Sequence, residues 1–246
     1  MQWSCAEGVV LRVSPVREAD RLLTIFSLER GKLLATAFGG ARPRSRKRAA
    51  TLPFCRARFF LKRRGDNYQV DQAELLERFP GLAHPRLLGY AGYLAEVVEG
   101  FSPLEEPNAP LYRLLVSSLR WLRQNPELVA QAFCLKLLRL GGLAPEMTAC
   151  SSCQRPFSPD WPKAYFSLPG GLLCPSCATG ERASLITPGS LRLLRALSEL
   201  PLGKIFTLKA SPASLAETGE VLSSLVTFHL GYRPRSLLYL QSLGSP

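Results

Sequence analysis

The chain has 246 residues, of which 46% are hydrophobic and 20% are charged, which excludes a disordered tail and indicates a globular protein with one large or two modest cores. It carries 31 Lys and Arg against 19 Asp and Glu, so its formal net charge is +12, and this surplus favours a polyanion such as nucleic acid as partner. Glu7 and Arg12 interrupt the first apolar run and no apolar stretch is long enough to span a membrane, so we expect no signal peptide and no membrane insertion.

The first eighty residues have the pattern of a small β-barrel. Short apolar runs at 8–13, 22–28 and 33–38 predict three strands, an alternating segment at 55–62 predicts a fourth, and a last strand is expected near Tyr68–Asp71. Five short strands joined by turns, with one strongly basic loop, are typical of an OB-type barrel. We therefore expect an OB-fold nucleic-acid-binding domain over residues 1–80.

Positive charge is concentrated inside this domain. From Arg30 to Gly65 there are twelve Lys or Arg residues and no Asp or Glu, a charge equal to the net charge of the whole chain. Five of the twelve stand in the loop 39–48, GGARPRSRKR, where Gly and Pro prevent a regular element, so that the loop is expected to be mobile and solvated. A Lys and Arg run is often just a solvated surface, and this remains the alternative interpretation.

The segment 55–62 assigns its residues to two faces of a strand. Cys55, Ala57, Phe59 and Leu61 are expected to point inward, and Arg56, Arg58, Phe60 and Lys62 outward. The outward set combines charges that bind phosphates with an aromatic ring on which a base can stack. Phe60 can equally well be a core or interdomain contact.

From Pro85 onward the apolar residues recur with a helical period. Helices are predicted at 86–101, 110–124, 127–140, 188–200 and 212–230, and Asn108, Thr187 and Ser211 are expected N-caps. Residues 81–246 are therefore predicted to form a helical domain, which makes the chain an α+β multidomain protein.

Four of the seven cysteines form two pairs, Cys150-x2-Cys153 and Cys174-x2-Cys177. Two such knuckles can complete a tetrahedron around one ion, so we predict one structural zinc per chain in a module at about 147–182. A redox dithiol, or ligands that have lost their metal, are the alternatives. Cys5, Cys55 and Cys134 are expected in the core, and the cysteines do not form a disulfide framework, which favours a reducing, cytoplasmic compartment.

No nucleotide-binding loop, dinucleotide fingerprint or nucleophile motif is found, so we expect a binding protein that is not an enzyme. Two carboxylate pairs, Glu96 with Glu99 and Glu105 with Glu106, keep a metal-dependent nuclease open as an alternative. Their surroundings favour ordinary solvated acids.

The chain contains the segments GVVLRVSPVREADRLLTIFSLERGK (8–32), AFGGARPRSR (37–46), RLGGLAP (139–145) before CSSC (150–153), CPSC (174–177) and GYRPRSL (231–237). Together, these segments resemble the RecO family of DNA repair and recombination mediators. The resemblance covers essentially the whole chain. Its opening segment and cysteine module are the specific parts, whereas the helical stretches match mainly in pattern.

The resemblance implies a mediator that binds single- and double-stranded DNA and anneals complementary strands. With RecR, RecO-like proteins help to load RecA onto strands coated by the single-strand binding protein SSB, whose acidic C-terminal tail they contact. It also implies a cytoplasmic, nucleoid-associated protein without a catalytic site. An OB and zinc-ribbon protein that binds RNA is the alternative.

The DNA contacts implied for this chain coincide with those chosen from charge and alternation. They are Arg42, Arg44, Arg46, Lys47 and Arg48 in the loop, and Arg56, Arg58, Lys62 and Arg63 on the strand. Phe60 is added to these candidates from the strand alternation alone. Arg12, Arg17 and Arg21 are weaker candidates, because Glu18 and Asp20 stand among them. The SSB tail requires an apolar groove with a basic rim, which we expect near Lys136 and Arg139.

Overall fold

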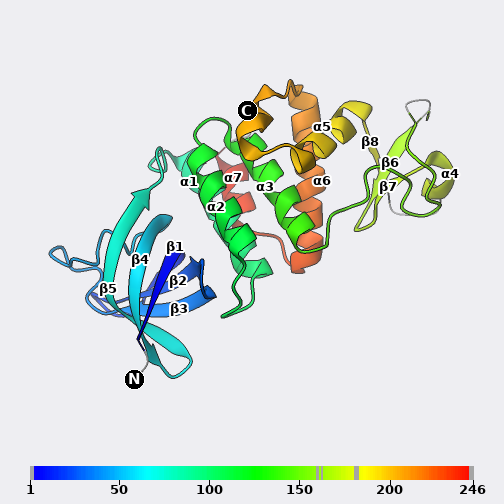
Figure 1. Cartoon of the computed structure of the whole chain (residues 1–246). Helices are drawn as coiled ribbons and strands as arrows, with labels where there is room; N and C mark the ends of the chain where they lie inside the picture. Colours follow the sequence, from blue (N-terminus) through cyan, green and yellow to red (C-terminus); the bar gives the residue numbers. More distant parts are fainter. Residues whose placement is uncertain (1–2, 159–160, 162, 180–182, 244–246) are drawn as a thin grey trace. The chain divides into compact units, whose positions relative to one another are not determined.

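The structure is a computed structural model that describes residues 3–158, 161, 163–179 and 183–243. The chain packs into two compact units, residues 1–123 together with 234–246, and residues 124–233 (Figure 1). The division after residue 80 that the sequence predicts follows a change in residue pattern, and it stays a prediction.

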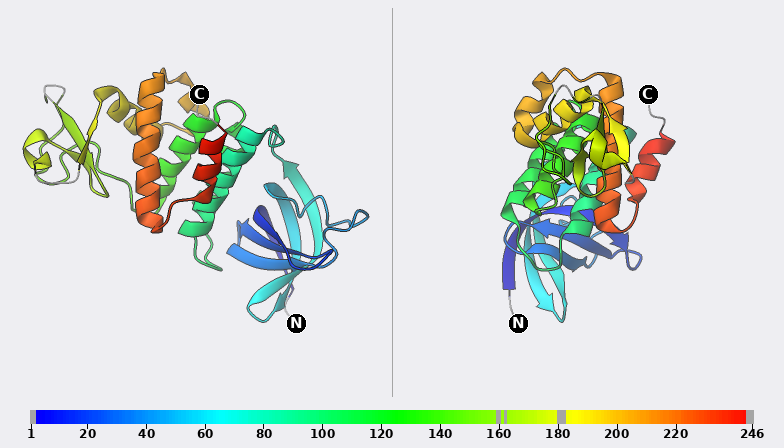
Figure 2. Two further views of the ribbon diagram at one scale, coloured as in Figure 1. Left: turned by 180° about the vertical axis from the view of Figure 1, so that it is seen from behind. Right: turned by 90° about the vertical axis from the view of Figure 1, so that its right-hand side faces the viewer.

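The first unit contains a closed five-stranded barrel, which confirms the predicted barrel architecture (Figures 1 and 2). Its strands follow the order β1-β2-β3-β5-β4, and β4 pairs with β1 to close the ring. Only β3 and β5 pair in parallel. β3 and β5 meet over two residue pairs, Ala35–Tyr68 and Thr36–Gln69, which closes the ring in the OB-type arrangement. The strands are β1 (Trp3–Pro15), β2 (Arg21–Ser27), β3 (Gly31–Ala37), β4 (Cys55–Arg64) and β5 (Asn67–Arg78).

The barrel interior is filled by alternating side chains, as the sequence predicts for β4. Phe59 and Leu61 are fully buried, and a register shift in β1 between Val10 and Arg12 lets Val10 and Val13, which are three residues apart, both pack into the barrel core. The prediction that Cys5 lies in the core is wrong. Cys5 stands opposite Phe60 on the outer face of the barrel and is exposed, because its neighbour Ala6 occupies the inward position.

Strand β5 is longer than the sequence indicated. Its second half, AELLER (73–78), is composed of good helix formers, yet it pairs with β4 up to the Cys55–Arg78 pair. Register shifts between Arg56 and Ala57 and between Phe60 and Leu61 accommodate the pairing. As a consequence, Glu74 lies opposite Arg58 and Glu77 opposite Arg56.

Three helices complete the first unit: α1 (Pro85–Phe101), α2 (Ala109–Trp121) and α7 (Arg235–Ser242). Helix α7 packs along α1 and was not predicted (Figure 2). Glu96 of α1 binds its first turn, accepting hydrogen bonds from the backbone N–H groups of Arg235 and Ser236 at 2.9 Å. The α1–α2 linker crosses the β2–β3 turn at Gly31, where the left-handed backbone and the close backbone of Glu106 both require glycine.

The second unit is a helical core carrying a small cysteine-rich module. Buried Gln131 joins two of its helices, donating to the Leu215 carbonyl at 2.8 Å and accepting from the Thr218 hydroxyl at 2.7 Å. Among the residues described in both units, no helix is long and apolar enough to cross a membrane. The helical elements are α3 (Pro126–Leu140), α5 (Pro188–Glu199), the 3-10 helix η1 (Leu202–Thr207) and α6 (Pro212–Leu230); the module holds β6 (Ala164–Ser167), β7 (Gly171–Leu173), α4 (Pro175–Ala178) and β8 (Ala183–Ile186).

Candidate nucleic-acid interface and metal centre

The basic loop, residues 39–48, lies between β3 and β4 and is folded into successive turns. The backbone N–H groups of Arg42, Ser45 and Arg48 each donate to the carbonyl three residues earlier, at 3.0 to 3.1 Å. The carboxylate of Asp20, from the β1–β2 loop, accepts from the N–H of Gly39 at 2.7 Å. These bonds satisfy the backbone locally, so the loop is ordered by its own turns although it contains neither helix nor strand, and the side chains are left to point outward.

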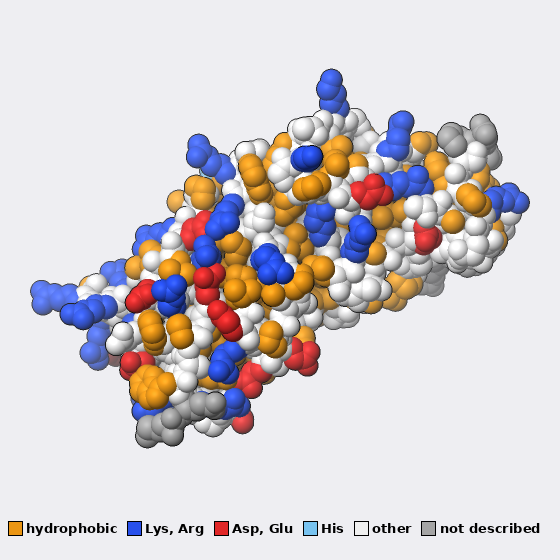
Figure 3. All heavy atoms as spheres, viewed as in Figure 1, with side chains coloured by type: hydrophobic (Ala, Val, Ile, Leu, Met, Phe, Trp, Pro, Cys, Tyr) orange, Lys and Arg blue, Asp and Glu red, His pale blue; other side chains and the backbone are white. Residues whose placement is uncertain are grey.

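Four arginines of the basic loop are exposed, and within the described part of the chain none of them forms an ion pair. They are Arg42, Arg44, Arg46 and Arg48. In Figure 3, Lys and Arg side chains project from the barrel on the side where Figure 1 shows this loop. Lys47 differs, because it is half-buried and its Nζ donates to the Val70 carbonyl at 3.2 Å. Among the described residues, the Asp20 carboxylate binds the start of the loop at Gly39 and no carboxylate pairs with the four arginines, so the loop presents a positive field.

The outer face of β4 has a different charge balance. Arg56 forms ion pairs at 2.8 Å with Glu7 of β1 and with Glu77 of β5. These acids are remote in sequence and reach Arg56 through strand pairing. Arg120 of α2 also binds Glu77 at 2.7 Å, and the Tyr112 hydroxyl donates to Glu7 at 2.9 Å. Arg56 is thus held in a network that joins three elements of the barrel unit to α2.

The network shifts the pKa values of its members. Burial alone raises the pKa of Glu7, but hydrogen bonds from Arg56 and Tyr112 lower it below its ordinary value. The hydrogen bond from Arg120 is the main cause that lowers the pKa of Glu77, with Arg56 adding to it. Burial and the hydrogen bond to Glu7 raise the pKa of Tyr112. Both carboxylates are therefore ionised at neutral pH, and they neutralise charge that the sequence places on the outer face.

Two further predicted contacts are paired more loosely. Arg58 lies 3.4 Å from Glu74 and Arg63 lies 3.3 Å from Glu105, and all four side chains are more than one third exposed. Exposed pairs of this kind contribute little to stability and exchange readily with water. Both arginines can therefore leave their partners for a phosphate at small cost.

Phe60 and Lys62 point outward near the end of β4 that leads into the β4–β5 turn. Among the described residues, Lys62 forms no ion pair. The Nζ of Lys62 lies 5.3 Å from the centroid of the Trp3 ring. Trp3 is 55% exposed, although it is an aromatic side chain on a barrel strand. Reasoning from sequence missed Trp3, because it precedes the first recognisable apolar run; the pairing of β1 with β4 brings it beside Lys62.

The weaker candidates divide in the same way. Arg12 forms an ion pair with Glu99 of α1 at 2.7 Å, and Arg21 donates to the hydroxyl of Thr51 at 3.0 Å. Arg17 is exposed in the β1–β2 loop. Two of the three arginines therefore support the local structure.

The four paired cysteines converge on one point in the second unit. Their sulfur atoms all lie within 4.8 Å of one another, and those of Cys153 and Cys174 are 3.7 Å apart. Sulfurs at the corners of a tetrahedron with metal–sulfur bonds of about 2.3 Å are separated by about 3.8 Å, so the arrangement fits a four-coordinate metal. The cluster could therefore hold a metal ion, as the spacing predicts.

Local structure prepares the first knuckle for a metal. Burial alone raises the pKa of Cys150, but backbone N–H groups from Cys153, Cys174 and Ser152 lower it to about 6. One of these groups, the N–H of Cys174, donates to the Cys150 sulfur at 3.4 Å. The thiolate, which is the form that binds metal, is thus favoured at neutral pH.

Arg195 of helix α5 contacts the cysteine module. The Nε of Arg195 donates to the Met147 carbonyl at 2.6 Å, and its guanidinium carbon lies 4.9 Å from the centroid of the Phe157 ring. Phe157 in turn packs edge-on against Trp161. The module is therefore fixed by contacts that do not involve the cysteines.

The carboxylate pairs that suggested a nuclease are engaged in separate contacts. Glu96 caps α7, whereas Glu99 binds Arg12. Glu105 accepts hydrogen bonds from Tyr68 and Arg63. The members of the first pair thus turn to different partners and do not share one metal position.

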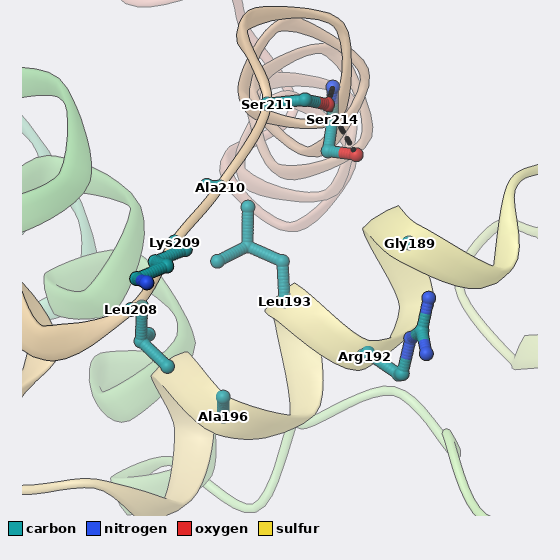
Figure 4. A pocket seen from close by; sticks show the side chains of 9 residues that line it. All are labelled: Gly189, Arg192, Leu193, Ala196, Leu208, Lys209, Ala210, Ser211 and Ser214. Carbon is teal, nitrogen blue, oxygen red and sulfur yellow. Dashed lines mark hydrogen bonds between the residues drawn. The ribbon is translucent and has the colours of Figure 1, made fainter.

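Lys136, near which the groove for an acidic tail is predicted, is partly buried, and the groove there stays a prediction. Its Nζ donates to the Ser198 carbonyl at 3.0 Å, and burial lowers its pKa. A cavity of about 450 Å³ lies elsewhere in the same unit, between α5 and the start of α6 (Figure 4). Leu193 and Leu208 supply apolar walls, with Arg192 and Lys209 at its sides.

Known proteins match this chain along nearly all its length. A family model described as the N-terminal part of recombination protein O matches residues 1–79, and one described as its C-terminal part matches 83–238. A protein of Desulforudis audaxviator named DNA repair protein RecO is 39% identical over 97% of this chain and 96% of its own length. Proteins of the same name from Pelotomaculum thermopropionicum and Moorella thermoacetica are 36% and 34% identical, again over 97% of this chain, and over 94% and 91% of their own lengths. The chain belongs to the RecO family.

Membership of the RecO family confirms the resemblance inferred from the residues, and it covers both units. The barrel lies within the N-terminal RecO match, and the cysteine cluster lies within the C-terminal one. The structure adds what the RecO resemblance could not supply, namely which cations of the barrel are already neutralised. It brings the loop arginines together as an exposed group and separates them from Arg56.

Proposed function

We propose that this RecO-family protein is a mediator of DNA repair and homologous recombination. In this proposal it binds single- and double-stranded DNA, anneals complementary strands and, with RecR, helps to load RecA onto single strands coated by SSB. The observation that carries the proposal is the basic loop, whose four exposed arginines have no acidic partner among the described residues. The names of the relatives, DNA repair protein RecO, support the same role.

The loop acts by neutralising phosphates. Two complementary strands repel each other, and cations that contact both backbones lower this repulsion while releasing bound counterions. Arg58, Arg63 and Lys62 extend the contact along β4, with Phe60 as an aromatic surface. Arg56 is less available to a phosphate than these residues, because its guanidinium already binds two carboxylates. No step requires a catalytic group, and the site of action is the nucleoid, in the cytoplasm.

The acidic tail of SSB binds the helical unit in this proposal. The cavity beside α5 offers apolar walls for its hydrophobic side chains and two exposed cations for its carboxylates. Replacing Arg192 and Lys209 by Glu should abolish binding of a tail peptide, measured by fluorescence anisotropy, and leave DNA binding intact. Lys136→Ala is the matched control, and a loss of peptide binding confined to that control would move the site to the helix α3.

The cysteine module holds one zinc ion in this proposal, and its role is structural. Four sulfur ligands leave no open position for water or substrate. Freshly purified, reduced protein should contain about one zinc per chain. Metal content near zero, with the module still folded, would exclude the assignment.

Annealing tests the proposed function directly. Complementary oligonucleotides are first coated with SSB, and their pairing is followed with and without this protein by fluorescence energy transfer. We expect acceleration over the uncatalysed rate, and loss of it when the four loop arginines are replaced by Ala. Tight DNA binding without acceleration would contradict a mediator, and preference for structured RNA in a parallel assay would favour a role with RNA. Cleavage of labelled DNA in the presence of Mg²⁺ or Mn²⁺ would indicate a nuclease.

A further inference from the structure

The outer wall of the barrel carries an aromatic patch, formed by Trp3 of β1, Phe60 and Lys62 of β4, and Gln72 of β5. Strand register puts these side chains on one face, because Trp3 is paired with Lys62, and Phe60 is paired with both Cys5 and Gln72. Directly paired residues of antiparallel strands share a face, and diagonal neighbours stand about 7–8 Å apart. The patch is therefore one continuous surface over three strands.

The chemistry of the patch differs from that of the neighbouring surface. Arg56 and Arg58, which precede Phe60 on the same outer face of β4, are bound to carboxylates. In the patch Lys62 has the Trp3 ring as its described neighbour. Asp71, which lies in the register shift of β5 next to Gln72, is the acid closest in sequence to the residues of the patch. Two cations, Lys62 and Arg64, outnumber it. Arg64 contacts Gln69 at 3.4 Å. An exposed indole, a second aromatic ring, a cation and an amide are thus presented together.

We propose that the aromatic patch binds unpaired bases of single-stranded DNA and makes the barrel distinguish single strands from duplex. Trp3 and Phe60 provide surfaces on which bases stack, Lys62 contacts the intervening phosphate, and Gln72 offers its amide to base edges. A base in a duplex is stacked between its neighbours and cannot reach the indole ring. The basic loop contacts phosphates, which single strands and duplex both present, so it does not distinguish the two forms of DNA.

This inference rests on the proposed function and adds that the annealed duplex is released from the aromatic patch. Two strands bound through the patch lose their contact with Trp3 and Phe60 once they pair, whereas their phosphates remain attractive to the loop. The annealed product is therefore bound less tightly than the separate strands, and the patch becomes available for new single strands. Annealing would then be accompanied by release of the product from this surface.

The test compares three probes: an oligo-dT strand, an abasic strand of the same length, and a blunt duplex. The abasic strand keeps the phosphates and lacks the bases, so it isolates stacking. Trp3→Ala should weaken oligo-dT binding about 5-fold to 150-fold, the range expected for loss of one stacked base, with binding of the other two probes unchanged. Trp3→Phe should retain most of the affinity, and Lys62→Ala should lower the salt dependence for both single strands.

Phe228→Ala is the matched control, because Phe228 is an aromatic residue of similar exposure in the other unit, and this variant should bind all three probes normally. Equal losses for Trp3→Ala on oligo-dT and abasic strands, or no loss on either, would overturn the stacking site. Failure of the proposed function looks different. In that case the unaltered protein would show no salt-dependent binding to either form of DNA.

Discussion

The basic loop and the outer face of β4 come from one stretch of sequence that contains no acid, yet they differ in how the fold pairs their arginines with carboxylates. The loop leaves the barrel between two strands and folds on its own turns, so no other element brings a carboxylate to its arginines among the described residues. Strand β4 lies between β1 and β5, and both neighbours contribute glutamates to it. Charge density along a sequence therefore overstates the surface field wherever strands pair.

The difference separates two roles that cations have on this barrel. Unpaired arginines on a loop are available to a ligand. Paired arginines on a strand hold elements together, and a ligand must compete with their carboxylates for them. Four predictions test whether this division is real.

The largest effect is expected from the loop. Replacing Arg42, Arg44, Arg46 and Arg48 by Ala should weaken single-strand binding on the order of 100-fold at low salt and reduce the slope of log K against log salt by up to about 2.8, or 0.7 for each lost phosphate contact. Binding titrations across salt concentrations measure both quantities. The control replaces the paired residues Arg12, Arg58 and Arg63, and a larger loss in that variant would reverse the comparison.

Arg56→Ala should act on stability. It leaves Glu7 and Glu77 partly buried with fewer partners, and because the site is only half-buried the cost is about 1–2 kcal/mol in the free energy of unfolding. Urea denaturation of the whole chain measures it, and Arg58→Ala, whose ion pair is exposed, should cost less than about 0.5 kcal/mol. A normal free energy of unfolding combined with a loop-sized loss of DNA affinity would show that Arg56 is a direct contact.

Acid should weaken the paired region specifically. The pKa values of Glu7 and Glu77 are lowered in the folded chain, so their stabilising contribution is complete above the unfolded value of about 4.3 and is lost as the pH falls through the lower folded values. Urea midpoints measured from neutral to acid pH should fall in that window. Glu77→Gln should flatten the decline, and an equally steep decline in this variant would place the sensitive groups elsewhere.

The smallest change should come from Glu74→Gln. It removes the exposed partner of Arg58 and should raise affinity for single strands a few-fold, with the salt slope steeper by about 0.7, while stability is unchanged. Binding that stays the same would mean that Arg58 lies outside the DNA path. Glu18→Gln, in the β1–β2 loop, serves as a control for the change in net charge.

The parts of the fold that local pattern determines could be predicted. Alternation at 55–62 assigned the two faces of β4, and N-caps such as Thr187 and Ser211 located helix starts. The segment AELLER could not be predicted as a strand, because its residues favour helix and only pairing with β4 overrides that preference. Helix α7 was missed for a similar reason, since its first turn depends on Glu96, far away in the sequence.

The candidate site, too, could be predicted from the sequence only where local pattern determines it. The cysteine spacing was sufficient to predict the cluster, because two knuckles can meet at only one kind of site. The loop cations could be selected from the sequence, but their freedom from acids could not. Glu7 and Glu77 stand outside the acid-free stretch, and Trp3 gains its meaning only from its pairing with Lys62.

Helix α7 also gives the chain an unusual topology. It belongs to the first unit, yet residues 124–233 intervene, so the second unit is an insertion whose two ends are both joined to the first. Docking α7 on α1 closes a chain loop around that entire insertion, and for a flexible chain of this length the entropic cost of closure is about 4 kcal/mol. The contacts of α7 with Glu96 and α1 must offset this cost. When they form, both ends of the inserted second unit are held by the first unit.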